Sequence, residues 1–333
     1  MKENKNSLIS HVDLDGVSVV IVAKLLGLLE MEDHPTLLDY SQLYVDEEET
    51  ISAVPTNENY SKVYYADLGI SEPIYSSLTE FYGKENVFFF DHHQQSLLFG
   101  DKENVYADEN KCGTKIFYDY LKSGKRVPTI LDNFVNIVDA YDRWLLDSPL
   151  REQSENLNRV LYRMVKWNAK NNYLKARPFI DYQIKKFLSQ TGTKAREFFF
   201  TDYEKYQIQL AIEKEEREYQ YALENVKKRE DSQGREFLIF HGSSKISYIC
   251  NRMLKENPHS QYVVAVNTFT GNPRVREITG RISVRSREDE FDCTHLKGVE
   301  GHIAAAGGML NPQFVHDLYN KDDYELGYKN ETI

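Results

Sequence analysis

The sequence lacks the long apolar runs and the cysteine patterns that mark two large classes of protein. No stretch of about 18 apolar residues occurs, the length that a helix needs to cross a bilayer, so a membrane-spanning protein is excluded. Three cysteines, Cys112, Cys250 and Cys293, are far apart and form no zinc-type spacing, which suits reduced thiols. Because the segment from Met1 to Ser7 is polar and contains no signal-peptide core, we expect a cytoplasmic protein without a membrane partner.

An excess of positive charge is also missing. Lysine and arginine together number 41 against 52 aspartates and glutamates, which gives a formal net charge of −11. A chain with a negative net charge is unsuited to binding long duplex nucleic acid, because that binding needs broad basic surfaces. It still allows a small phosphate substrate held through metal ions, since bound cations would neutralise some of the carboxylates. With 333 residues, the chain is long enough for two domains.

The most informative stretch is an apolar run that ends on three polar residues. Residues 88–90 are Phe-Phe-Phe, which predicts a short buried strand, and Asp91, His92 and His93 follow at once. A core strand has no structural need for a carboxylate and two imidazoles at its tip. A metal or phosphate site does, because open α/β sheets place their chemistry at the carboxyl ends of the strands.

A second set of polar side chains lies between a predicted strand at 7–10 and a predicted helix at 17–29. His11, Asp13 and Asp15 alternate with other residues, so they point the same way if this segment is extended. They would then be three convergent ligands. An acidic turn with a helix cap is an equally good interpretation of these residues taken alone.

A third strand tip carries one carboxylate. Residues 63–66 predict a strand that runs into Asp67, and a helix follows before the strand at 88–90. Taken alone, Asp67 would be a helix cap, but it is the third member of a series of strands that end on acidic or imidazole residues. Strands that alternate with helices predict a parallel α/β sheet with one set of ligands at its carboxyl edge.

Two helices complete this predicted edge. The helix at about 112–121 begins with Cys-Gly-Thr, and its amino terminus could help to hold an anion. A further helix at about 129–146 contains Asp139 and Asp142, which are three residues apart and share a face. One of the two can reach the sheet edge.

The second half of the chain has a different pattern. Residues 154–229 are predicted to be helical and strongly charged, and a second α/β unit starts near residue 235. Residues 281–287 alternate Arg or Ser with apolar residues, which predicts a strand whose polar face contacts phosphate, or an ordinary edge strand that carries arginines. Residues 301–308 are rich in Gly and Ala, which lets the backbone approach a ligand closely or lets elements pack tightly.

The polar residues of the first sheet edge form one set of candidate ligands. They are His11, Asp13, Asp15, Asp67, His92 and either Asp139 or Asp142. Carboxylates and imidazoles without a thiolate suit Mn²⁺ first, then Mg²⁺ or Co²⁺, and do not exclude Zn²⁺. Such a set is too large for one ion with an open position and fits two divalent cations bridged by Asp67, which activate a water for displacement at phosphorus. His93 would then hydrogen-bond the phosphoryl oxygens.

Five motifs give the chain a resemblance to a known family. His-x-Asp-x-Asp-Gly at 11–16, Asp67, Asp-His-His at 91–93 and Asp142 resemble, in this order, the four motifs of the DHH phosphoesterase family. Gly-His-x-x-Ala-Ala-Gly-Gly at 301–308 resembles the signature of the DHH-associated carboxyl-terminal domain. Within the family, the first motif and Tyr-Asp-Arg-Trp at 141–144 are most similar to the NrnB-type nano-RNases. Those are cytoplasmic, Mn²⁺-dependent enzymes that remove mononucleotides from very short RNA.

The resemblance implies a role for each of these residues. One metal ion would be held by His11, Asp13 and Asp67, and the other by Asp15, Asp67, His92 and Asp142. The catalytic residues beside the metals would be Asp91 and His93. The residues that bind the substrate would be Arg285, Ser286, Gly301, His302, Gly307 and Gly308. Asp142 is favoured over Asp139 because the family often has an apolar or aromatic residue two positions after this aspartate, as at Trp144. Glu300 departs from the signature, which usually has a further glycine there.

The expected architecture follows from the resemblance. It has a parallel-sheet catalytic domain at 1–153, a helical connector at 154–232 and a smaller α/β substrate-binding domain at 233–322. The expected activity is the exonucleolytic hydrolysis of very short RNA or dinucleotides, and the resemblance is compatible with a homodimer. Alternatives on the same scaffold are a hydrolase of linear or cyclic dinucleotide signals, a phosphatase of 3′-phosphoadenosine 5′-phosphate and a RecJ-like exonuclease. A non-catalytic DHH scaffold is disfavoured, because every expected ligand is present.

Overall fold

The computed structural model describes most of the chain and divides it into two compact units, Met1–Ile208 and Gln209–Ile333. The described residues are 5–43, 60–145, 147–190, 197–231, 234–242, 246–270, 278–287, 291–293, 300–302 and 304–309. The predicted carboxyl-terminal boundary at residue 322 lies outside them, and the three-part division of the chain stays a prediction.

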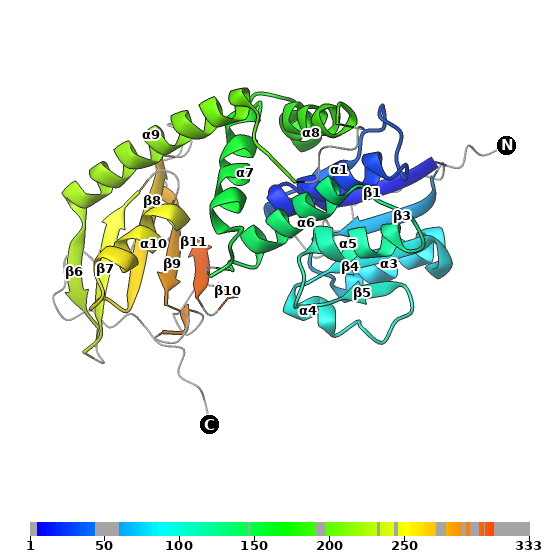
Figure 1. Ribbon diagram of the computed structural model, residues 1–333. Coiled ribbons are helices and arrows are strands. Elements are labelled where there is room, and N and C mark those ends of the chain that lie inside the picture. The colour runs from blue at the N-terminus through cyan, green and yellow to red at the C-terminus, as the bar shows by residue number, and fades with distance from the viewer. Residues whose placement is uncertain are drawn as a thin grey trace. The chain divides into compact units, whose positions relative to one another are not determined.

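The first unit is built on a five-stranded sheet in the order β2-β1-β3-β4-β5. All neighbouring strands are parallel (Figure 1). The strands are β1 (Lys5–His11), β2 (Thr36–Leu38), β3 (Tyr60–Ala66), β4 (Val87–Asp91) and β5 (Val105–Ala107). The predicted α/β class with a parallel sheet is therefore confirmed.

Helices cover both faces of this sheet because its strands are apolar on both sides. They are α1 (Leu14–Leu25), α2 (Tyr40–Leu43), α3 (Glu72–Tyr82), α4 (Gln94–Leu97), α5 (Gly113–Lys122), α6 (Thr129–Asp142), α7 (Arg151–Met164) and α8 (Asn172–Leu188), with a short 3₁₀ turn at Lys84–Asn86. On one face Tyr64 and Phe90 pack in a large core with α1, α5, α6 and α8. On the other face Tyr65 and Phe89 pack with α3.

The second unit has a six-stranded sheet in the order β10-β11-β9-β8-β7-β6. Its strands are β6 (Lys227–Glu230), β7 (Glu236–His241), β8 (Tyr262–Thr270), β9 (Ile278–Ser286), β10 (Glu300–His302) and β11 (Ala305–Met309). Only the β7–β8 pair is parallel among the described pairs. Helix α10 (Ile246–Glu256) and the second half of α9 (Asp202–Asn225) pack on one face through Met253 and Tyr219.

Two local predictions need correction. The helical pattern predicted to continue to residue 229 ends at Asn225, because Lys227–Glu230 pairs with β7 as an antiparallel edge strand. The helix predicted to reach residue 146 ends at Asp142. Trp144 adopts a φ of 56°, a left-handed conformation that cannot continue an α-helix.

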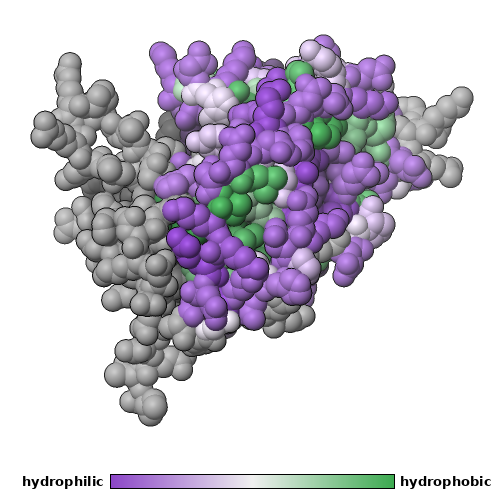
Figure 2. Space-filling model, turned by 90° about the vertical axis from the view of Figure 1, so that its left-hand side faces the viewer, coloured by the Kyte–Doolittle hydropathy of each residue, from purple (hydrophilic) through white to green (hydrophobic). Residues whose placement is uncertain are grey.

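The hydrophilic surface and the free cysteines agree with the amino-acid composition. On the face in Figure 2, the coloured surface is mostly hydrophilic, with a hydrophobic area near its centre. Within the described residues, no helix is long and apolar enough to cross a membrane. Cys112, Cys250 and Cys293 are buried free thiols, as the sequence predicts.

Candidate metal centre

The turn between β1 and α1 places two of the predicted ligands. His11 ends β1, and Asp13 caps α1 by accepting a hydrogen bond from the backbone N–H of Gly16 at 3.0 Å. A side chain at Gly16 would come within 2.3 Å of the carbonyl oxygen of His11, so only glycine fits this turn. The other end of the Asp13 carboxylate lies 3.1 Å from His11 Nδ1.

Asp15 is held by the amino terminus of α5. Its carboxylate oxygens accept hydrogen bonds from the backbone N–H groups of Gly113 at 2.7 Å and Thr114 at 2.8 Å. The Thr114 hydroxyl also donates to the Asp15 carbonyl oxygen at 2.6 Å. The helix terminus that the sequence predicts to hold an anion therefore holds the Asp15 carboxylate of the protein itself. These hydrogen bonds fix the direction of the remaining lone pairs of Asp15.

Asp67 lies at the centre of the cluster. It follows β3 with a φ of 56°, which is uncommon outside glycine and aims its buried side chain back over the ends of the strands. Its two carboxylate oxygens lie 3.9 Å from His11 Nδ1 and 3.5 Å from His92 Nε2. Asp67 therefore reaches both imidazoles that end the neighbouring strands.

The structure separates the two candidates for the motif-four ligand. Asp142, the last residue of α6, has Oδ2 3.3 Å from His92 Nε2. Asp139 instead accepts hydrogen bonds from the backbone N–H of Cys112 and from Lys115 Nζ, each at 2.9 Å. Asp142 is thus in the cluster, whereas Asp139 anchors the start of α5.

Asp91 and His93 form a pair beside the cluster. Asp91 is fully buried, and its oxygens contact His93 Nδ1 at 2.7 Å and accept a hydrogen bond from the Ser96 hydroxyl. Burial acts to lower the pKa of His93, but its hydrogen bond with Asp91 and the Asp91 charge outweigh burial and raise it. Both oxygens of Asp91 are engaged, so its carboxylate orients His93.

The candidate ligands fall into two groups that Asp67 connects through His92. His11, Asp13 and Asp67 offer ligand atoms that all lie within 4.8 Å of one another, and so do Asp15, His92 and Asp142. Asp67 also belongs to a third such group with His92. A carboxylate that reaches both groups is the arrangement that a bridging ligand requires.

The electrostatics of the cluster favour bound cations. Burial, followed by repulsion from Asp15 and Asp13, raises the pKa values of Asp67 and Asp142 well above the ordinary range. Among the described residues, Asp67 Oδ2 and Asp142 Oδ2 are buried without a hydrogen-bond partner. Unpaired buried carboxylate oxygens cost free energy, and divalent cations would supply the missing partners. The residues therefore fit divalent metal ions.

The predicted substrate-binding residues of the second unit lie on β9, β10 and β11. Arg285 Nη1 donates to the carbonyl oxygen of Val284 at 2.8 Å. The Ser286 hydroxyl is buried and donates to the Phe291 carbonyl oxygen at 2.6 Å, so a phosphate would have to replace that bond. Gly307 is close-packed, since a side chain there would come within 3.0 Å of the Ile282 carbonyl oxygen.

Three further residues of the second unit belong to the same predicted set. Gly308 lies opposite Ile282 in the β11–β9 ladder. Gly301 and His302 lie on β10, where His302 pairs with Ala305. The side chain of His302 lies outside the described residues, so its predicted role stays a prediction.

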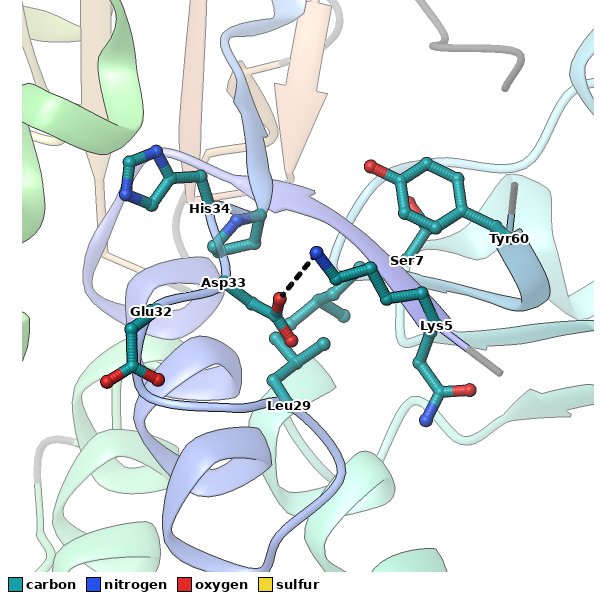
Figure 3. Close-up of a pocket in the computed structure, with 10 residues that line it drawn as sticks. Lys5, Ser7, Leu29, Glu32, Asp33, His34 and Tyr60 are labelled. Carbon is teal, nitrogen blue, oxygen red and sulfur yellow. Dashed lines mark ion pairs between the residues drawn. The ribbon is translucent and has the colours of Figure 1, made fainter. Parts of the chain in front are cut away.

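A pocket at the opposite edge of the first sheet is separate from the cluster. It is lined by residues at the starts of strands, among them Lys5 and Tyr60, and by the segment before β2. Figure 3 shows Lys5 directed towards Asp33, with which it forms an ion pair of 3.7 Å. The candidate ligands lie at the carboxyl ends of the same strands, so this pocket is not part of the metal centre.

The sequence analysis did not predict the supporting roles of three residues. Ser96 holds Asp91, Asp139 holds the start of α5, and Gly113 lets that start approach the cluster. A side chain at Gly113 would lie 2.7 Å from Asp67 Cβ. The glycine after Cys112 was a signal for this close approach, but nothing local to Ser96 or Asp139 indicates their partners.

Comparisons with known proteins agree with this architecture. No family model matches the chain. The DHH domain of a member of the s1p family of ribosomal proteins matches with a TM-score of 0.60 at 12% identity, over 95% of this chain and 85% of that one. RecJ from Thermus thermophilus, solved in complex with Mn²⁺, matches with a TM-score of 0.50 at 13% identity, over 96% of this chain and 53% of RecJ. At these identities the likeness shows the fold.

One curated relative matches along nearly the whole chain. Oligoribonuclease NrnB of Bacillus subtilis (strain 168) is 27% identical over 337 residues, which cover 96% of this chain and 76% of NrnB.

The fold, the strand-tip motifs and these relatives support a phosphodiesterase-type hydrolase that is similar to DHH-domain proteins. Along nearly its whole length the chain is similar to NrnB.

Proposed function

We propose that the protein removes mononucleotides from very short RNA with the help of two divalent cations, of which Mn²⁺ is the best candidate. The name of the relative, an oligoribonuclease, supports the substrate. The observation that carries the metal requirement is the pair of ligand groups that Asp67 connects through its contact with His92. Carboxylate and imidazole ligands suit Mn²⁺, with Mg²⁺ or Co²⁺ as alternatives.

Each ligand group would hold one cation. One cation would be held by His11, Asp13 and Asp67. The other would be held by Asp15, His92 and Asp142, together with Asp67, which lies 3.5 Å from His92. Bound there, the cations would supply an activated water and would offset the negative charge of the phosphate. The net charge of −11 would otherwise oppose the approach of an anionic substrate.

The chain's own groups would orient the phosphate. His93 has a raised pKa because of Asp91, which favours the charged imidazolium and suits it to donate a hydrogen bond to a phosphoryl oxygen. The buried Asp91 would fix the direction of this donor. The catalytic domain proposed at 1–153 carries all of these residues.

The second unit would bind the remainder of the substrate. We place this role on Arg285, Ser286, Gly301, His302, Gly307 and Gly308, in the domain proposed at 233–322 and joined by the segment 154–232. A Cβ atom at Gly307 would make a tight contact of 3.0 Å with the Ile282 carbonyl oxygen, so this position on β11 favours glycine.

A panel of substrates tests the proposal. It contains labelled RNAs from a dinucleotide to a decanucleotide, matched DNAs, linear and cyclic dinucleotides and 3′-phosphoadenosine 5′-phosphate, each with Mn²⁺, Mg²⁺ or Co²⁺. We expect the highest kcat/KM on the shortest RNAs with Mn²⁺, and at least a roughly 100-fold loss in Asp67→Asn, because that variant weakens both metal sites. Equal turnover of all lengths, or a preference for another substrate class, would contradict the proposal.

A further inference from the structure

Two exposed aromatic rings lie next to each other where α7 ends and the loop to α8 begins. Tyr162 is 38% exposed, and Trp167 is 66% exposed. Their ring centroids are 6.2 Å apart, and their planes differ by 10°. An indole exposed to this extent does not contribute its full area to a core, so its free surface is available for another flat ring.

The end of α7 is tied to the helix that carries Asp142. Asn158, one turn before Tyr162 on α7, donates a hydrogen bond at 2.6 Å to the hydroxyl of Tyr141. Tyr141 directly precedes Asp142 on α6, and α6 packs against α7. Tyr162 therefore projects from a helix that packs against α6, which carries Asp142, and Trp167 lies just beyond the end of that helix.

The most exposed of the candidate ligands lies close enough to Tyr162 for its charge to act on the tyrosine hydroxyl. Asp13 has the most exposed side chain of the candidate ligands, at 36%. Partial burial, followed by the charges of Asp13 and Asp39, raises the pKa of Tyr162 to about 12, so the tyrosine hydroxyl lies within the field of these carboxylates. A phosphate that enters over Asp13 would bring its nucleoside into the neighbourhood of the pair.

We propose that Tyr162 and Trp167 form a stacking platform for one nucleobase of the substrate whose phosphate lies at the metal centre. The proposal rests on the proposed function in that the ligand is a short RNA. Aromatic stacking is tolerant of sequence because every base has a π-face, so the platform binds a base without selecting its identity. It also suits an acidic chain, because a neutral base can approach where a further phosphate would be repelled.

Another exposed aromatic pair supplies a matched control. Phe81, on α3, is 46% exposed and packs edge-on against Tyr82, with planes at 72°. Its helix, α3, packs on the other face of the sheet from α6. Phe81→Ala therefore removes an exposed ring of similar size without touching the proposed platform.

Kinetics on a dinucleotide RNA test the platform. We expect Trp167→Ala to raise KM roughly tenfold, with the loss in kcat/KM carried mainly by KM, because alanine substitution removes base stacking. Trp167→Phe should recover most of the loss, and Phe81→Ala should match the wild type. The difference in KM between the wild type and Trp167→Ala should be smaller on a substrate with an abasic site in place of the stacked nucleoside. An unchanged KM in Trp167→Ala, or an equal loss on the abasic substrate, overturns the platform.

A fluorescence measurement tests base binding by the platform independently of RNA hydrolysis. The chain has two tryptophans, so the difference between wild type and Trp167→Phe isolates the signal of Trp167. We expect adenosine 5′-monophosphate to quench this signal saturably. If the wild type hydrolyses short RNA but shows no such quenching, the platform is wrong and the proposed function stands. If the quenching is present but no RNA is hydrolysed, the platform stands and the proposed function is wrong.

Discussion

Asp67 combines three properties that rarely occur together in one residue. It is buried, it has a left-handed backbone conformation, and its pKa is raised by burial and then by the charges of neighbouring aspartates. Each property costs free energy in the absence of a cation. Their combination at the point where two ligand groups meet indicates that this position is shaped by ligand binding, with stability as the cost.

Gly113 lies against the candidate metal centre, although it offers no ligand atom. A Cβ atom there would lie 2.7 Å from Asp67 Cβ and 3.1 Å from Asp15 Oδ2, so α5 would have to move away from the cluster. We therefore expect Gly113→Ala to weaken Mn²⁺ binding by roughly 10- to 100-fold, the range for residues that support metal ligands. Isothermal titration with Mn²⁺ measures the effect.

Gly100→Ala is the control for this substitution, since its Cβ would approach the Leu97 carbonyl oxygen at 3.2 Å, away from the ligands. If Gly113→Ala bound Mn²⁺ as tightly as Gly100→Ala, the close approach of α5 would have no part in shaping the centre.

At the scale of elements, helix ends do most of the positioning. The start of α1 is capped by Asp13, the start of α5 holds Asp15, and the end of α6 presents Asp142. Asp139 secures α5 by accepting the N–H of Cys112. Ligands on short, tied helix ends have few rotamers available, which keeps the cluster preorganised.

A buried ion pair fastens α8 to the start of α9. Lys186 Nζ donates to Glu204 Oε1 at 2.8 Å, and both side chains are almost inaccessible to solvent. We expect Lys186→Met to lower the free energy of unfolding by about 3 kcal/mol, because Glu204 would stay buried without a counter-charge. Urea unfolding followed by circular dichroism measures this loss.

Lys185→Met removes the neighbouring, exposed lysine and serves as the matched control. Equal stability of the two variants would show that Glu204 needs no counter-charge.

At the scale of the whole molecule, metal binding and stability are coupled. The pKa values of Asp67 and Asp142 are higher in the folded protein than in the unfolded chain, so above their ordinary range the folded state binds more protons than the unfolded state. The stability of the metal-free protein therefore falls as the pH rises from about 4 through these raised values. Cations displace the same protons, so their stabilising effect should grow with pH.

We expect Mn²⁺ to raise Tm by several degrees near pH 8 and by less near pH 5. At a concentration about 100 times Kd, each site would contribute about 2.7 kcal/mol. Thermal unfolding with Mn²⁺ and with EDTA at each pH measures the difference, and Asp67→Asn should lose most of it. A gain that is the same at both pH values would contradict the coupling.

The sequence by itself determined the class of fold and the identity of the strand-tip residues. Alternating apolar segments and helical stretches are local signals, and so are the polar residues that follow Phe90 and Ala66. These signals sufficed for the parallel sheet. They could not show that Lys227–Glu230 joins a sheet, because an edge strand of charged residues has the same composition as an exposed helix.

Only the tertiary structure decided which groups meet. Asp139 and Asp142 share a helix face, and their spacing alone prefers neither. The resemblance favoured Asp142, and the contacts of Asp139 with α5 and of Asp142 with His92 agree with that choice. No local pattern indicated that Ser96 contacts Asp91 or that Tyr162 lies beside Trp167. Contacts between segments distant in the chain depend on how elements pack, and packing is a property of the whole core that no short stretch of sequence encodes.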